Sequence, residues 1–542
     1  MPSFSPRLFT FVALFGLLAV ANAAAILPRT WYRVLSTPHG DISGESSAMG
    51  TRYTVPYAKA PTGSLRFKDP VTIDTFSSYD ASQLPDACPQ MSATGPIGSE
   101  DCLFVTIYTP PSATKSSKLP VLAWVHGGSF VQGASSILDG AALAKSQNMV
   151  VVTIQYRLGA LGWLKSYALG LDGNYGLKDI IQALKLVQTD ISAFGGDSNK
   201  VTLAGQSSAA EIIKSLLVTP SATSLFTRAI LQSAPLNTVD QSSTTANAVS
   251  TLFLSQDYLG CDTSSCLQNK SIEDLLTAQS WVMQDALGLQ GQLDSDFAFS
   301  EPLRAVVDGS LVTRGFRQTV ASGGQLEGPS KELIFTTVKD EGCTTIASIV
   351  PNTAAAEQAG FENLVGMAYP YQAASIISSG LYNPNNLVGA DRIREQLLRL
   401  NSDFSWTCPN QQTAVRLTAS NGFSSKIYLG EFDLGISYNG GAIDFCKGRV
   451  DHQDDIATLF STPSGLSSAQ KTLSAEVQAR WGAFARTGSP NASGYTSWPT
   501  VSASTGDLNV LQLGVAAGGK SRVTKSQRDT ECKVGSGLYT FV

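Results

Sequence analysis

Between about residues 119 and 235, short apolar runs alternate with stretches of helical spacing. The runs at 119–125 and 150–156 are rich in β-branched residues, which predicts strands buried on both faces. Residues 176–191 have apolar side chains three and four positions apart, which predicts a helix that ends before Gly195-Gly196-Asp197. Residues 201–204, 209–217 and 228–232 then predict strand, helix and strand. This repeated alternation predicts an α/β fold, with a large, mostly parallel sheet flanked by helices.

The remaining pattern extends the same architecture. Residues 354–367 and 391–400 have helical spacing, and 425–429 predict a further strand. Ser/Thr/Gly-rich passages at 112–118, 238–250 and 461–470 are interpreted as loops rather than domain linkers. We therefore expect one domain at 24–542, with loop and helix insertions.

The first 23 residues have the features of a signal peptide. Arg7 precedes the apolar run at 8–20, and Ala21-Asn22-Ala23 offers a cleavage site between small residues. The run is short for a membrane span, which needs about 20 apolar residues, so an uncleaved anchor is the less favoured alternative. No later segment has the length and apolarity to span a bilayer. The sequence thus predicts a secreted protein.

Export is consistent with the cysteine content. The chain has eight cysteines, at 88, 102, 261, 266, 343, 408, 446 and 532, an even number that suits disulfides in an oxidising compartment. None has the spacing of a metal site. Cys88 with Cys102, and Cys261 with Cys266, are close enough to close short loops, whereas the other four allow three pairings. Asn269 and Asn491 begin glycosylation sequons that could be used outside the cytosol.

Charge narrows the range of partners. The net charge of −5 and the pI of about 5.4 argue against nucleic acid or an anionic membrane surface as the main partner. A neutral small molecule or lipid remains compatible, and nothing in the composition bears on the oligomeric state.

A candidate nucleophile lies where a predicted strand meets a predicted helix, in Gly205-Gln206-Ser207-Ser208-Ala209. A serine on such a turn is held in a strained conformation that exposes its hydroxyl above the sheet. The pattern G-x-S-x-G would place glycine at position 209, and we expect the turn to tolerate one extra methyl group. The alternative interpretation of Ser207 is an ordinary helix N-cap.

A candidate oxyanion hole follows the strand at 119–125, in His126-Gly127-Gly128-Ser129-Phe130. Consecutive glycines leave backbone N–H groups unobstructed, and one such donor contributes about 3–4 kcal/mol to stabilising a tetrahedral intermediate. The N–H of Ser208 would supply the matching donor from the turn.

The candidate base follows from the scarcity of histidine. Only His39, His126 and His452 are present, and the order Ser…Asp/Glu…His of this architecture requires a histidine after Ser207. His452 alone satisfies that order. For the acid that orients it, Asp340 and Glu341 follow the apolar run at 333–338, and local chemistry does not choose between them.

Several motifs occur together in one order along most of the chain. They lie at 55–58 (VPYA), 65–67 (LRF), 99–103 (SEDCL), 126–130 (HGGSF), 173–177 (GNYGL), 194–197 (FGGD), 307–309 (VDG), 481–491 and 498–499 (WP). With these motifs the chain resembles the type-B carboxylesterase/lipase family, which includes cholinesterases and fungal lipases. The combination is far more specific than any single motif.

The resemblance implies an α/β-hydrolase fold and Glu341 as the acid. It also implies disulfide loops Cys88–Cys102 and Cys261–Cys266, and oxyanion donors at Gly128, Ser129 and Ser208. The chain departs from the family pattern at four positions, where Ser129, Ala209 and Gln453 replace common glycines and Gln206 replaces a common glutamate. These departures bear on substrate range and rate more than on reaction type, because each position of the triad holds a competent residue.

We therefore expect a serine carboxylic-ester hydrolase that acts through an acyl-enzyme on Ser207 and needs no metal or organic cofactor. Its expected partner is a small-molecule or lipid ester. Two alternatives stay open: an acyltransferase or lactone-processing enzyme on the same scaffold, and a catalytically silent binding module.

Overall fold

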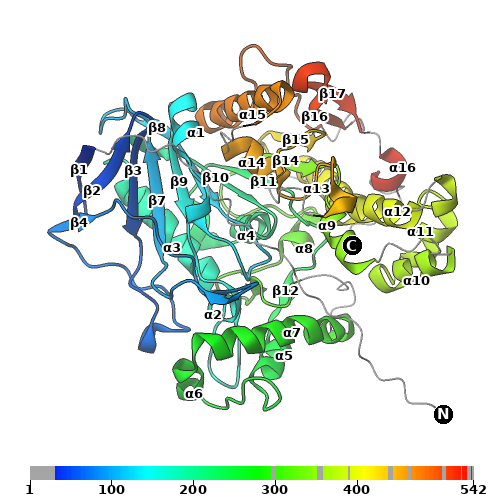
Figure 1. The fold of residues 1–542 in the computed structure, drawn as a ribbon, viewed down its shortest axis with the longest axis horizontal. Coiled ribbons are helices and arrows are strands. Elements are labelled where there is room, and N and C mark those ends of the chain that lie inside the picture. Colours follow the sequence, from blue (N-terminus) through cyan, green and yellow to red (C-terminus); the bar gives the residue numbers. More distant parts are fainter. Residues whose placement is uncertain are drawn as a thin grey trace.

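The computed structural model describes residues 31–293, 301–350, 358–370, 372–388, 391–420, 422–437, 443–460, 465–502, 508–526, 528–533, 537 and 539. The expected signal peptide lies outside the described residues. One sheet of thirteen strands runs through the molecule (Figure 1). In spatial order it consists of β1 (Trp31–Thr37), β2 (Gly40–Ser47), β3 (Gly50–Pro56), β7 (Phe104–Thr109), β9 (Val150–Ile154), β8 (Leu119–Val125), β10 (Gly196–Gln206), β11 (Arg228–Gln232), β14 (Glu332–Val338), β15 (Ile427–Phe432), β16 (Asn509–Ala516) and β17 (Lys520–Lys525), while β4 (Ser78–Asp80) pairs with β2.

The seven strands from β9 to β16 are parallel to one another, whereas β1, β2, β3, β7 and β17 join their neighbours in the spatial order antiparallel. Because parallel strands need crossover helices on both faces, the central strands are buried and apolar throughout. Every residue of β8 and β9 is buried. The predicted α/β architecture is confirmed.

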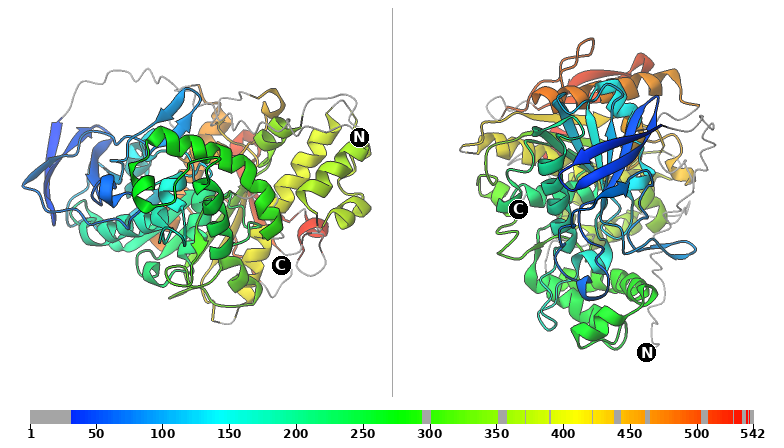
Figure 2. Two further views of the ribbon diagram at one scale, coloured as in Figure 1. Left: turned by 90° about the horizontal axis from the view of Figure 1, so that it is seen from below. Right: turned by 90° about the vertical axis from the view of Figure 1, so that its left-hand side faces the viewer.

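Alternate residues of β8 pack into two separate hydrophobic cores. Val121 and Val125 join the cluster that includes α3 (Tyr175–Asp190) and α4 (Ser208–Leu216), while Trp124 joins the opposite cluster. That second cluster is built from α14 (Asp454–Phe460) and α15 (Ser468–Thr487), and Figure 2 shows the helices on either side of the sheet. The two-residue period of a strand produces this layering.

Two groups of helices lie outside the sheet layers. Helices α5 (Ser243–Leu254), α6 (Ser264–Asn269) and α7 (Ile272–Leu293) gather below the sheet in Figure 1. At the right of the same view lie α10 (Gln358–Ala368), α11 (Ala373–Ser379) and α12 (Arg392–Asn401), which include the helices expected at 354–367 and 391–400. The first part of the former prediction, 354–357, lies outside the described residues.

The loop expected at 238–250 is wrong. Instead β12 (Gln241–Ser242) leads into α5, whose first turn is capped by the Ser242 hydroxyl accepting the N–H of Thr245. Val249 and Phe253 bury the inner face of this helix. Serine and threonine favour loops by composition, but a cap and an apolar stripe outweigh that preference. The prediction of a loop at 461–470 is likewise wrong for its last residues, because Ser467 and Gln470 form a capping box that starts α15.

Four disulfides connect the eight cysteines. Cys88–Cys102 and Cys261–Cys266 close the short loops that the resemblance implies. Cys343–Cys446 and Cys408–Cys532 are the pairings that the sequence left open. The paired cysteines are 103 and 124 residues apart in the sequence, so these two disulfides crosslink distant segments of the last third of the chain.

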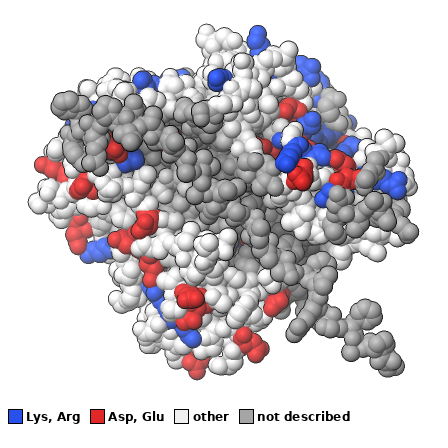
Figure 3. Space-filling view, viewed as in Figure 1, with Lys and Arg blue, Asp and Glu red and all other residues white. Residues whose placement is uncertain are grey.

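The surface carries mixed charge. Figure 3 shows acidic and basic side chains scattered among uncharged ones on one face of the molecule, as a weakly acidic chain would have. Across the helices that the structure describes, none combines the length and hydropathy of a membrane span.

Candidate active site

Ser207 lies between the last residue of β10 and the first residue of α4. Its φ of 60° and ψ of −127° fall in a region that residues with a side chain rarely adopt, so the turn is strained. The Ser207 N–H donates to the carbonyl of Gln232 on the adjacent strand at 2.9 Å, which anchors the turn to the sheet. This is the conformation expected of a nucleophile at a strand-to-helix turn.

The turn accommodates Ala209 because Gly205 has no side chain. A Cβ atom at Gly205 would lie 2.8 Å from the Cβ of Ala209, closer than two carbon atoms can pack. The strand and the helix therefore approach closely even with alanine in place of the common glycine, as the sequence suggested.

The glycine loop after β8 lies directly against this turn. A Cβ atom at Gly127 would lie 2.5 Å from the carbonyl oxygen of Gln206 and 3.2 Å from the Cβ of Ser207. Gly128 and Ser129 have φ values of 119° and 53°, which turn their amides out of a regular strand. Throughout the described residues, the N–H groups of Gly128, Ser129 and Ser208 donate to no other group. Three unpaired donors beside a strained serine are available for a ligand oxygen.

His126 supports the loop. Its ring stacks on Tyr156 with centroids 4.6 Å apart, and the Tyr156 hydroxyl donates to the His126 carbonyl at 2.9 Å. Burial lowers the pKa of His126 to about 4, while a hydrogen bond with Gly127 raises it slightly. The imidazole is therefore neutral at physiological pH.

His452 and Glu341 form the tightest polar contact of the site. The Nδ1 atom of His452 lies 2.6 Å from Oε2 of Glu341, whose other oxygen accepts the N–H of Val338 at 2.9 Å. Glu341 is fully buried, whereas the His452 side chain is 17% exposed. Held by two donors, the carboxylate fixes the ring and places the proton on Nδ1.

Asp340, the other candidate acid, is directed elsewhere. Its carboxylate accepts the backbone N–H of Val450 at 3.1 Å and lies 3.9 Å from Arg449. Of the two candidate acids, Glu341 is therefore the one that contacts the imidazole.

The other ring nitrogen faces the turn. The Nε2 atom of His452 lies 3.2 Å from the side-chain nitrogen of Gln206, the residue before Ser207. Because Nδ1 carries the proton, Nε2 has a lone pair and accepts this hydrogen bond. Ser207 Oγ and His452 form no hydrogen bond in the described structure, although the Gln206 contact brings the ring to the turn. Such catalytic contacts often form only when substrate is bound.

A second carboxylate lies behind the histidine. Asp455 is fully buried and accepts a hydrogen bond from Gln232 at 2.7 Å, and Gln232 in turn accepts from the indole of Trp481 at 3.0 Å. Burial, with the charge of Glu341, raises the pKa of Asp455 to about 6. No local sequence pattern shows that Asp455 points inward, so the sequence alone does not identify it as part of the site.

Opposing effects set the pKa of His452. Burial alone would lower it, but the hydrogen bond and the charge of Glu341, followed by Asp455 and Asp451, raise it above the ordinary value for histidine. The protonated ring is thus stabilised, which suits a base that must carry a proton transiently.

Other candidate positions lie apart from the site. Asn269 and Asn491 are exposed, although the Asn491 side chain is hydrogen-bonded to the backbone of Trp498. The carboxylate of Asp451 approaches the sulfur atoms of Cys343 and Cys446, but a disulfide consumes both thiols, so this group offers no thiolate ligands.

Comparisons with known proteins identify chains of similar sequence and fold. A family model described as the carboxylesterase family matches residues 32–534. Carboxylesterase 1E of Mus musculus is 30% identical over 487 residues, covering 84% of each chain, and carboxylesterase 1D of the same species is 29% identical over 511 residues, covering 87% of this chain and 86% of its own. A solved PNB esterase has a TM-score of 0.74 at 25% identity, over 92% of this chain and 98% of its own.

Proposed function

Because the chain belongs to the carboxylesterase family, and is thus a carboxylic-ester hydrolase, we propose that Ser207 is the residue that forms its acyl-enzyme. The observation that carries the proposal is the position of His452, whose Nδ1 contacts Glu341 while its Nε2 faces the turn that holds Ser207. Glu341 serves as the orienting acid and His452 as the general base.

In the proposed first step, Nε2 of His452 leaves Gln206 and accepts the proton of the Ser207 hydroxyl as Oγ attacks the ester carbonyl. The unpaired N–H groups of Gly128, Ser129 and Ser208 stabilise the oxyanion. The imidazolium then protonates the departing alcohol, and the acyl group stays on Ser207. Water repeats the sequence in the second step and releases the acid.

Export is part of the proposal. The segment at 1–23 supports secretion, and four disulfides are consistent with an oxidising compartment. The sequons at Asn269 and Asn491 would carry glycans there, and both asparagines are exposed.

A fluorophosphonate probe tests the nucleophile, since it reacts with an activated serine. We expect one adduct on Ser207 in the folded protein, and loss of both the adduct and p-nitrophenyl ester hydrolysis in Ser207→Ala. Residual hydrolysis above about a hundredth of wild type would contradict the assignment, because the loss of a triad nucleophile costs far more than that. Absence of an adduct in wild type would favour the silent binding module.

Product analysis separates hydrolysis from acyl transfer. If water is the natural acceptor, the free acid dominates even when a competing alcohol is present at millimolar concentration. A transferred ester as the main product would instead favour the acyltransferase alternative.

A further inference from the structure

The side chain of Gln90 contacts the far end of the glycine loop after β8, residues 126–133. Its nitrogen donates to the carbonyl of Gly133 at 2.9 Å, and its oxygen accepts the N–H of the same residue at 2.9 Å. One amide group therefore satisfies both backbone groups of Gly133.

Gln90 is itself held firmly. It begins β5 (Gln90–Ser92) and is only 1% exposed. The second hydrogen of its side-chain nitrogen is donated to the carbonyl of Cys88 at 3.0 Å, and Cys88 is crosslinked to Cys102. With both donors and the acceptor in use, the amide has one orientation and connects the disulfide loop to the glycine loop.

Gly133 lies against the peptide that carries the first oxyanion donor. A Cβ atom at Gly133 would lie 2.4 Å from the carbonyl oxygen of Gly127. That carbonyl and the N–H of Gly128 belong to the same planar peptide unit, so they can only turn together. The position of Gly133 therefore restricts the direction in which the Gly128 N–H points.

The second donor is fixed in a similar way. The carbonyl of Gly128 accepts the N–H of Val131 at 3.1 Å and the N–H of Gln132 at 3.0 Å. It shares a planar peptide unit with the N–H of Ser129. Because Gln132 directly precedes Gly133, the hold on Gly133 also sets the direction of the Ser129 N–H.

Two other contacts support the earlier part of the glycine loop. The hydroxyl of Tyr156 donates to the carbonyl of His126, and the N–H of Gly159 donates to the carbonyl of Phe130 at 2.7 Å. Neither contact reaches the end of the loop, which is the part that Gln90 holds.

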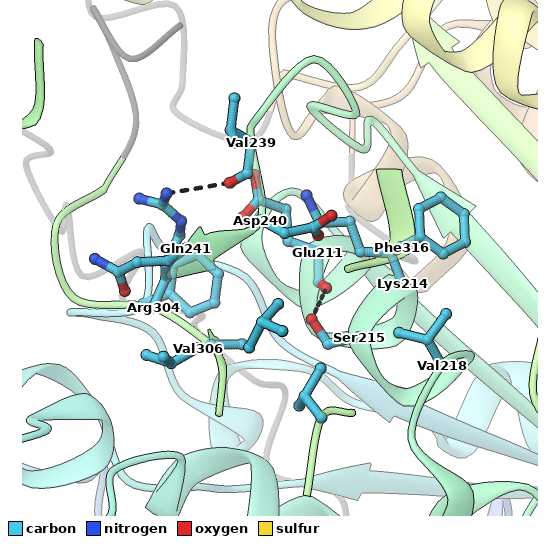
Figure 4. Close-up of a pocket in the computed structure, with 14 residues that line it drawn as sticks. Glu211, Lys214, Ser215, Val218, Val239, Asp240, Gln241, Arg304, Val306 and Phe316 are labelled. Atoms are coloured by element: carbon cyan, nitrogen blue, oxygen red, sulfur yellow. Dashed lines mark hydrogen bonds between the residues drawn. The ribbon is translucent and has the colours of Figure 1, made fainter. Parts of the chain in front are cut away.

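The packing of the loop leaves room for movement. Phe130 lines a small cavity against α4, with Glu211 and Lys214 in the wall (Figure 4). The cavity has room for about one water molecule. The loop is therefore not completely packed on this side, and it can shift if Gly133 is released.

We propose that Gln90 is a positioning residue for the oxyanion donors, because its hold on Gly133 fixes the peptide units that carry the N–H groups of Gly128 and Ser129. This inference rests on the acyl-enzyme mechanism proposed for Ser207. A displacement of about 1 Å in a catalytic site can cost about 10²-fold in rate. Gly133 is partly exposed, so water can replace the lost hydrogen bonds and a variant can fold although the donors have moved.

Gln90→Met tests the proposal, because it keeps the size of the side chain and removes its three hydrogen bonds. We expect kcat/KM for p-nitrophenyl butanoate to fall by about 10- to 100-fold. The Ki of 1,1,1-trifluorooctan-2-one should rise by a similar factor, since this ketone forms a tetrahedral adduct with the nucleophile and presents an oxyanion to the donors. The Ki of octan-2-one, which has the same shape and stays a ketone, should change less than about twofold.

Gln412→Met is the matched control. Gln412 is also 1% exposed and donates to the carbonyl of a disulfide-bonded cysteine, Cys532, at 2.9 Å and to that of Tyr539 at 3.0 Å. The control should lower the thermal unfolding temperature about as much as Gln90→Met, while kcat/KM and both Ki values stay at the wild-type level. Gln90→Asn, whose amide is one methylene group short of Gly133, should lose about threefold or more in kcat/KM and provides the test if Gln90→Met does not fold.

Three results would overturn the proposal: wild-type kcat/KM and trifluoroketone affinity in a folded Gln90 variant, an equal loss in Gln412→Met, or an equal loss of affinity for both ketones. None of them affects the nucleophile assignment, which the fluorophosphonate adduct on Ser207 reports separately. If Ser207 proved not to be the nucleophile, a selective loss of trifluoroketone affinity in Gln90→Met would still support the role of Gln90 in holding the donors.

Discussion

The side-chain amide of Gln206 donates to Nε2 of His452 across 3.2 Å, so this donor occupies the lone pair that must accept the Ser207 proton. This contact stabilises the neutral imidazole, because an N–H donor on Nε2 cannot coexist with a proton there. Opposite it, Glu341 stabilises the protonated ring from Nδ1 at 2.6 Å. The basicity of His452 therefore depends on two neighbours with opposite effects.

Replacement of Gln206 by glutamate should reverse one of these effects. A carboxylate beside Nε2 stabilises the imidazolium, so we expect the acid limb of the kcat/KM profile to move up by about one pH unit. The pH dependence of p-nitrophenyl acetate hydrolysis measures this shift. As a control, Gln182→Glu adds the same charge on α3, where the side chain contacts Thr72 rather than His452, and should leave the acid limb of the profile unchanged. A limb that moves down in Gln206→Glu would contradict the geometry.

Glu341 and Asp340 give a second comparison, between adjacent residues. Glu341→Gln should lower kcat by about 10³–10⁴-fold, because the amide no longer holds the required tautomer or stabilises the imidazolium. Asp340→Asn should retain most of the activity, since that carboxylate contacts Val450 and Arg449 rather than the imidazole. Steady-state kinetics of both purified variants decides the matter. Equal losses in the two would count against Glu341 as the orienting acid.

The difference between these two acids also shows where sequence reasoning reached its limit. Order along the chain identified Ser207 and His452, because a single histidine follows the candidate nucleophile. It left Asp340 and Glu341 equal on local chemistry, since neighbours in sequence differ only in the direction of their side chains. The buried pair Gln232 and Asp455 gave no sequence signal, because its contact spans 223 residues.

The same limit applies to the fold. Strands such as β8 and β9, buried on both faces, are continuous apolar runs and were readily predicted. Helix α5 was missed because its serines and threonines resemble a loop, and only the cap at Ser242 and the buried Phe253 distinguish it. Whether such a segment forms a helix or a loop depends on packing partners far along the chain, and amino-acid composition does not show those contacts.

Asp455 links pH to both activity and stability. Its pKa of about 6 lies above the value of an exposed aspartate, so the native state binds the proton more tightly than the unfolded chain. Tighter proton binding by Asp455 contributes its full stabilisation of the native state below about pH 4. This stabilisation is lost as the pH rises through 6. Asp455→Asn removes the cost of a buried charge and should raise the free energy of unfolding at pH 7.5 by up to about 2–3 kcal/mol.

The same substitution should move the acid limb of kcat/KM to lower pH, because Asp455 helps to raise the pKa of His452. Urea unfolding at pH 5 and pH 7.5, together with the pH–rate profile, measures both effects. Asp257→Asn, an exposed aspartate after α5, should change neither. The prediction would be contradicted if Asp455→Asn gained less stability over wild type at pH 7.5 than at pH 5.

Gly127, in the glycine loop after β8, lies against the turn that holds Ser207, and one methyl group there should separate the two. In Gly127→Ala the new Cβ would lie 2.5 Å from the carbonyl oxygen of Gln206, so the loop must move. Displaced N–H donors no longer meet the developing oxyanion, and we expect kcat to fall by about 10²–10³-fold. Gly360→Ala in α10, where a Cβ meets no neighbour, should keep wild-type kcat and unfold at the same or a slightly higher temperature. If Gly127→Ala kept the wild-type kcat while folded, the loop after β8 could not supply the oxyanion donors.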